Sequence, residues 1–103
     1  MYRLWAIDEE MQAARRTGAR YMLVCFDVWD RQRGDEDFGY YYPHFATAQE
    51  VRDFLAGKQL DEDRTGNADV CEAVIDLDRM GEKFDEALSE KPSAWLARMS
   101  SLN

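Results

Sequence analysis

The stretch Tyr21-Met22-Leu23-Val24-Cys25-Phe26-Asp27-Val28-Trp29 decides the fold of this 103-residue chain. It predicts a strand over residues 20–29, in which alternate side chains point to opposite faces. Both faces are apolar apart from Asp27, so we expect this strand at the centre of a sheet that is covered on both sides. The strand opens a larger unit, residues 21–57, which predicts a strand, a loop, a second strand and a helix.

The second strand is predicted by the run Phe38-Gly39-Tyr40-Tyr41-Tyr42-Pro43-His44-Phe45. Pro43 has no N–H to donate, so the strand suits the edge of a sheet or ends at this residue. Period-two alternation turns Tyr40 and Tyr42 to one face and Tyr41 to the other. Because three consecutive tyrosines cannot all be buried in one strand, we expect at least one tyrosine face to meet solvent or a partner.

The strongest local signal is the capping box Thr47-Ala48-Gln49-Glu50. In such a box the hydroxyl of the first residue accepts a hydrogen bond from the N–H of the fourth, whose carboxylate accepts one from the N–H of the first. We therefore expect a short helix over residues 47–56 that stops at Gly57. Residues 58–68 predict a loop.

The remaining segments complete the predicted order. Residues 4–17 predict an amphipathic helix, which is shorter if Asp8 is its N-cap. Residues 69–77 alternate between apolar and polar side chains, a pattern that is typical of a half-buried third strand. Two short helices are expected towards the end, one around Phe84, Ala87 and Leu88, and one that starts at Pro92.

The predicted order is therefore helix, strand, strand, helix, strand, helix, helix, in one domain over residues 1–103. The first two strands form a hairpin, and the helix over residues 47–56 returns the chain by a right-handed crossover. Placing the third strand beside the first gives the sheet order 2-1-3 with antiparallel neighbours, a split β-α-β arrangement. We predict a small α+β domain, a three-stranded antiparallel sheet packed with helices.

The net charge of −8 is concentrated in residues 27–90, which carry eighteen acidic and seven basic side chains. This excess disfavours direct binding to nucleic acid or to an anionic membrane, because phosphate contacts need a patch of Lys and Arg. It permits docking on a basic protein surface, although solubility is the commoner reason for acidic excess. With no apolar run near the roughly 20 residues of a membrane span, and no signal peptide before Asp8, we expect the cytoplasm.

Cys25 and Cys71 each lie in an apolar run, without a second Cys or His at metal-ligand spacing. This pattern is typical of two buried free thiols, and nothing in the sequence favours the alternative, a disulfide between adjacent strands. Two cysteines and one histidine are too few for a usual structural zinc site. His44 has no triad partners at a known spacing, and the chain contains no phosphate loop or nucleophile elbow. We expect no cofactor and no catalytic residue.

Aromatic and acidic side chains around the connector 30–37 form the best candidate interaction surface. Tyrosine and tryptophan dominate interface hot spots, although a chain of this length also needs aromatic residues for its core. The predicted partner-binding residues are Trp29, Asp30, Asp35, Glu36, Asp37, Phe38, Tyr40, Tyr41 and Tyr42.

The sequence thus favours a non-catalytic acidic protein-interaction module whose partner has a basic surface. One form of this hypothesis is an inhibitor whose carboxylates replace phosphates in the groove of a nucleic-acid-binding protein. Inhibitors of this kind in phages and mobile elements, such as anti-restriction and anti-CRISPR proteins, are often small and acidic. A first alternative is a divalent-metal-dependent hydrolase or nuclease that uses Asp27, Asp30 and Asp76. A second is a self-associating structural protein, a homodimer formed through a sheet edge or through the C-terminal stripe of Trp95, Leu96 and Met99.

Overall fold

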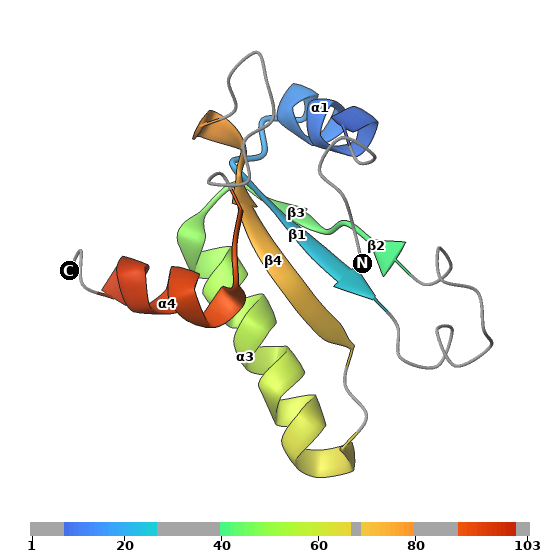
Figure 1. Cartoon of the computed structure of the whole chain (residues 1–103), viewed down its shortest axis with the longest axis vertical. Coiled ribbons are helices and arrows are strands. Elements are labelled where there is room, and N and C mark those ends of the chain that lie inside the picture. Colours follow the sequence, from blue (N-terminus) through green and yellow to red (C-terminus); the bar gives the residue numbers. More distant parts are fainter. Residues whose placement is uncertain (1–7, 27–39, 67–68, 80–88, 101–103) are drawn as a thin grey trace.

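The computed structural model describes residues 8–26, 40–66, 69–79 and 89–100 (Figure 1). Within these ranges the chain has the predicted α+β class, with helices packed on an antiparallel sheet. In chain order the elements are α1 (Asp8–Arg16), β1 (Tyr21–Phe26), β2 (Tyr40–Tyr41), β3 (His44–Phe45), α3 (Ala48–Thr65), β4 (Val70–Asp76), the 3₁₀ helix η2 (Leu77–Arg79), β5 (Ser89–Glu90) and α4 (Pro92–Ser100).

The sheet has the strand order β2-β1-β4-β5, and β3 also pairs with β1. Every pair of neighbouring strands is antiparallel. β2 and β3 therefore flank β1 on one edge, and β4 flanks it on the other, as the predicted order requires. The predicted number of three strands is wrong, because the described residues form five.

The additional strands have two physical origins. Pro43 splits the predicted second strand into β2 and β3, because it has no N–H for the ladder. Its carbonyl oxygen still accepts a hydrogen bond from the N–H of Leu23 at 2.8 Å, which keeps the split strand against β1. The other addition is β5, which pairs with Val74 and Ile75 of β4. A strand of two residues is too short for alternation to reveal it.

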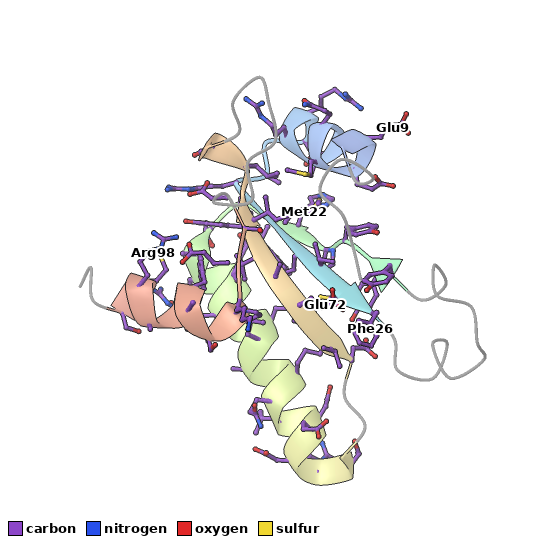
Figure 2. All side chains as sticks on the ribbon, viewed as in Figure 1. Glu9, Met22, Phe26, Glu72 and Arg98 are labelled. Carbon is purple, nitrogen blue, oxygen red and sulfur yellow. The ribbon has the colours of Figure 1, made fainter. Side chains whose placement is uncertain are left out.

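β1 lies at the centre of the core, and all six of its side chains are buried. Its residues divide between two clusters, one on each face of the sheet. The α1-side cluster consists of Met11, Ala14, Ala19, Met22, Val24, Ala73, Ile75 and Leu77. The α3-side cluster consists of Tyr21, Leu23, Cys25, Val51, Val74 and Trp95. The structure thus confirms a central strand that is covered on both faces, with Met22 beneath α1 in Figure 2.

α3 begins as predicted, at the capping box. The Thr47 hydroxyl accepts a hydrogen bond from the N–H of Glu50 at 3.2 Å, and the Glu50 carboxylate accepts one from the N–H of Thr47 at 3.2 Å. The first turn of the helix then buries Val51 against β1, in the α3-side cluster. The cap therefore fixes where the helix meets the sheet.

The end of α3 differs from the prediction. The helix continues through Gly57 to Gly66, so the predicted loop is wrong over residues 58–65. One glycine inside a helix costs only about 1 kcal/mol relative to alanine, and the side chain of Gln59 donates to Asp63 one turn later at 3.0 Å. Gly66 provides the actual stop, with a left-handed φ of 71°.

The two outer helices agree with their predictions where the structure describes them. α1 lies within the predicted helix 4–17, and Gly18 follows it with a φ of 87°. α4 begins at Pro92, and its Trp95 ring meets Tyr21 edge-on with centroids 5.6 Å apart. Outside the described residues lie the N-terminal end of the predicted first helix, the end of the predicted first strand, the connector 30–37 and the helix expected around Phe84, Ala87 and Leu88.

Alanine at the two α3 glycines should change stability in opposite directions. Gly57→Ala should raise the free energy of unfolding by about 0.5–1 kcal/mol, because the site is helix interior, and a Cβ there meets nothing within 4 Å. Gly66→Ala should lower it by about 1 kcal/mol, because its positive φ strains an L side chain. Urea denaturation measures both changes. Destabilisation by Gly57→Ala would contradict a continuous α3.

Candidate functional site

Among the predicted partner-binding residues, the structure describes the three tyrosines. Tyr40 and Tyr42 pack against the α1-side cluster and Tyr41 packs against the α3-side cluster, so the predicted alternation is confirmed. All three are half-buried, which leaves part of each side chain at the surface. Outside the described residues lie Trp29, Asp30, Asp35, Glu36, Asp37 and Phe38.

The hydroxyl groups of Tyr40 and Tyr41 reach across β1. They connect β2, on one edge of β1, to β4 and the residue Asp69 before it, on the other edge. Tyr40 donates to the Glu72 carboxylate at 3.0 Å, and its ring centroid lies 5.6 Å from that of Phe26. Figure 2 shows Phe26 and Glu72 together at one end of the sheet. Tyr41 donates to the Asp69 carboxylate at 2.5 Å. These tyrosines therefore have a structural role. Only the exposed parts of their side chains are accessible to a partner.

A bulge in β4 brings the two cysteines opposite each other. Val24 pairs with Ala73, but the next residue of β1, Cys25, pairs with Cys71 and leaves Glu72 as the extra residue. The two Sγ atoms lie 3.2 Å apart, with Cys25 as the donor, and both thiols are free. Cys25 is fully buried and Cys71 is half-buried, so the pair reaches from the core to the surface.

Charged and phenolic groups surround this pair of sulfur atoms. The Lys58 ammonium of α3 lies 3.3 Å from the carboxylate oxygen of Asp69, which precedes β4. The same oxygen accepts the hydrogen bond from Tyr41, and Tyr41 is the register partner of Cys25. The two thiols, the Lys58 ammonium, the Asp69 carboxylate and the Tyr41 hydroxyl therefore lie close together. They form a small group of polar side chains at the edge of the α3-side cluster.

The surroundings displace the pKa values of the two thiols in opposite directions. The pKa of Cys25 is raised, first because its thiol donates the hydrogen bond to Cys71 and then because burial disfavours its anion. The same hydrogen bond lowers the pKa of Cys71, against the opposing effect of burial, and the positive charge of Lys58 lowers it further. Because the thiolate is the nucleophilic form of cysteine, these pKa directions favour nucleophilic character at Cys71 over Cys25.

Cys71 also lines a cavity of about 620 Å³ between α3, β4 and α4, which we call the α3–α4 cavity. A volume of this size lies within the usual range of small-molecule sites, about 300–1,000 Å³. Its apolar lining includes Leu55 and Leu96. Its charged lining consists of Arg52, Lys58, Glu62 and Asp69. The arrangement combines a nucleophile with binding groups of both signs.

The last two turns of α3 form the second candidate surface. Every residue from Gln59 to Gly66 is exposed. Figure 1 shows this end of the helix extending beyond the point where β4 begins. Leu60 is 61% exposed, a high value for a large apolar side chain. We call this segment the acidic end of α3, after its three carboxylates Asp61, Glu62 and Asp63.

Asp76, which the hydrolase alternative would use, is the only one of its three carboxylates among the described residues. The antiparallel register places Asp76 opposite Tyr21, and Asp27 and Asp30 lie outside the described residues. The Asp76 carboxylate accepts a hydrogen bond from the N–H of Asp78 at 3.1 Å and lies 3.8 Å from Arg20. Among the described residues, no three His, Cys, Asp or Glu side chains are grouped to hold a metal ion.

The C-terminal apolar stripe, which the homodimer alternative would use, packs inwards. Trp95 is only 1% exposed, and Leu96 and Met99 are partly buried against the α3-side cluster. Arg98, three residues after Trp95, holds Glu90 of β5 with two nitrogen atoms, at 2.6 and 2.9 Å. The stripe therefore contributes mainly to the core of its own chain.

The thiol pair is the arrangement that sequence reasoning missed. The sequence predicts two buried free thiols on neighbouring antiparallel strands, and this adjacency is the available signal. Alternation does not predict that Cys25 pairs with Cys71. In a regular register, without the bulge, Cys25 would pair with Glu72. Charge pattern likewise reveals Asp61, Glu62 and Asp63 but not that they stand on a helix.

Comparison of the chain with protein-family models, with curated proteins and with solved structures gave no match. Among the described residues, no helix is both long enough and apolar enough to cross a membrane.

Tyr41 should make the protein less stable at alkaline pH. Burial and the hydrogen bond to Asp69 raise its pKa above the ordinary value of 10.0. The unfolded chain releases this proton near 10.0 while the folded chain retains it, so the contribution of Tyr41 is complete below that pH and is lost as the pH rises through its folded-state pKa. Urea denaturation at neutral pH and about one unit above 10.0 should show a smaller alkaline loss in Tyr41→Phe than in the wild type. Equal losses in the two proteins would contradict this role.

Proposed function

We propose that this chain is a non-catalytic protein-interaction module that docks an acidic surface on a protein partner with a basic surface. The observation that carries the proposal is the acidic end of α3, where Asp61, Glu62 and Asp63 are exposed on a helix beyond the sheet (Figure 1). A helix holds carboxylates in a fixed arrangement, whereas a flexible loop loses conformational entropy when it binds. Presentation on a helix therefore supports docking better than the predicted loop would.

Charge and apolar surface both support this docking. The net charge of −8 attracts a basic partner over distance and speeds its association. Leu60 precedes the three carboxylates and provides exposed apolar area beside them. Interfaces commonly combine a desolvated apolar centre with a polar rim, and the acidic end of α3 offers both components.

The proposed partner is a nucleic-acid-binding protein that the module inhibits in the cytoplasm. Successive helical residues turn by about 100° and rise by about 1.5 Å, so Asp61, Glu62 and Asp63 cover a wide arc around the helix. A concave groove lined with Lys and Arg can meet such an arc on several sides, as it meets the phosphates of a nucleic acid. Tyr41, bound to Asp69 on the α3 side of the sheet, could extend the contact.

Reversing charge at the acidic end of α3 should abolish capture of the partner. We expect wild-type protein, used as bait in a lysate of the native host, to retain one basic protein at low salt and to lose it as salt is added, because screening weakens exposed charge pairs. Asp61→Lys with Asp63→Lys should prevent capture at low salt. Mass spectrometry identifies the retained protein, and titration of that purified protein measures each affinity.

The matched control is Glu9→Lys with Glu10→Lys, which makes the same change in net charge on exposed residues of α1. This variant should still capture the partner, because α1 covers the opposite face of the sheet. Equal loss in both variants, or capture that salt does not weaken, would contradict the proposed surface.

Reversal of Asp35, Glu36 and Asp37 tests whether the connector contributes. Sedimentation of the purified chain separates partner binding from the homodimer alternative.

A further inference from the structure

Two thiols meet across β1 and β4 beside the α3–α4 cavity. Cys25 and Cys71 are register partners, and their Sγ atoms lie 3.2 Å apart. Directly paired residues of antiparallel strands have Cα atoms about 4.5–5.5 Å apart, which is within the range that a disulfide spans. A bond of about 2.0 Å between the two sulfur atoms therefore requires only a small movement.

We propose that Cys25 and Cys71 form a redox-active dithiol that exchanges with a small-molecule disulfide held in the α3–α4 cavity. This function goes beyond the docking proposed above and does not depend on it. Cys71 lines the cavity and is half-buried, so an incoming disulfide can reach it. Cys25 is fully buried and is not part of the cavity lining, so an incoming disulfide meets Cys71 first. Cys71 is therefore the attacking thiol and Cys25 the resolving thiol.

The groups that face the pair support this division of roles. Inert core thiols have apolar neighbours that raise their pKa values, whereas Cys71 has its pKa lowered by Cys25 and Lys58. Cys25 donates the hydrogen bond that favours the Cys71 thiolate. The other titratable neighbours are Asp69, whose negative charge raises the pKa of Cys71 and so opposes the effect of Lys58, and Tyr41, which donates to the Asp69 carboxylate.

The proposed reaction has two exchange steps. In the first, the Cys71 thiolate attacks one sulfur atom of the small disulfide, whose S–S bond breaks to release one small thiolate and leave a mixed disulfide on Cys71. In the second, the Cys25 sulfur attacks the Cys71 sulfur and gives up its proton to the released thiolate. The second small thiolate then leaves as the Cys25–Cys71 bond forms, and it takes up from water the proton that Cys71 gave to water when its thiolate formed. The dithiol loses two electrons and two protons, and the small disulfide becomes two thiols.

The cavity lining suits a disulfide that carries charges of both signs. Arg52 can bind a carboxylate and Glu62 can bind an ammonium group, whereas Lys58 and Asp69 are paired with each other at 3.3 Å. Leu55 adds apolar contact beside them. Glutathione disulfide carries both kinds of charged group, and it is the probe used below.

The test exposes the folded, fully reduced chain to glutathione disulfide and then blocks the remaining thiols with iodoacetamide. Intact-mass measurement should show a product that has lost two hydrogen atoms and carries no alkyl group, and peptide mapping should join Cys25 to Cys71. The same chain unfolded in urea is treated in parallel to show that the oxidant is active. If the unfolded chain is oxidised while the folded chain keeps both thiols, the proposal is overturned.

Single variants separate the two roles. Cys25→Ser should stop at a mixed disulfide on Cys71, because no resolving thiol remains. Cys71→Ser should form its mixed disulfide at least about 10-fold more slowly, because Cys25 is buried and its thiolate is disfavoured. Cys25→Ala repeats the first measurement if serine at this buried position disturbs folding, which circular dichroism detects. Equal rates in the Cys25 and Cys71 variants would overturn the proposal.

Charge variants test the position of the thiolate. Lys58→Gln should slow the first step several-fold at neutral pH and shift its pH profile upwards, whereas Lys58→Arg should keep most of the rate. Arg16→Gln removes the same charge from an exposed residue of α1, and it should react like the wild type. Equal rates in Lys58→Gln and Arg16→Gln would overturn the assigned electrostatic support of Cys71.

Discussion

Burial of β1 on both faces is the constraint on which the other elements depend. Each large apolar side chain that β1 buries contributes about 1.5–3 kcal/mol, but only if both faces are covered. α1 covers one face, and α3 with α4 covers the other. The backbone N–H and C=O groups of a buried strand must also be paired along both edges. β4 pairs one edge, and β2 with β3 pairs the other around Pro43.

The same constraint explains why polar side chains lie beside the β4 bulge, where the pairing of β1 with β4 shifts between Val24 and Cys25. In a regular register Glu72 would take the position opposite Cys25, on the face of the α3-side cluster. Burying an unpaired carboxylate there would cost several kcal/mol. The bulge instead gives Glu72 a hydrogen bond from Tyr40 and puts the small, polarizable side chain of Cys71 opposite Cys25. A device that protects the core thus also pairs the two thiols.

The sequence predicts those features that depend on neighbouring residues, and it fails where distant segments decide. The continuous apolar run predicts the burial of β1 on both faces, and the capping box at Thr47 predicts the start of α3. The role of Gly57 cannot be read from the sequence, because a glycine is compatible with both the interior and the end of a helix. It ends the helix only where a left-handed backbone conformation lets the terminal backbone groups form hydrogen bonds. Gly66 meets that condition, with its N–H donating to the Glu62 carbonyl at 2.8 Å. The pairing of Cys25 depends on a bulge in another strand, which no local pattern encodes.

α3 contributes residues to both proposed sites. Its first half is anchored in the core through Val51, which leaves its second half free to extend beyond the sheet. Glu62 belongs to both surfaces, because it lines the α3–α4 cavity and is one of the three carboxylates of the acidic end. Lys58 lies one turn earlier, beside Asp69 and the thiols. A basic partner that contacts Glu62 would therefore change the charge balance of the cavity.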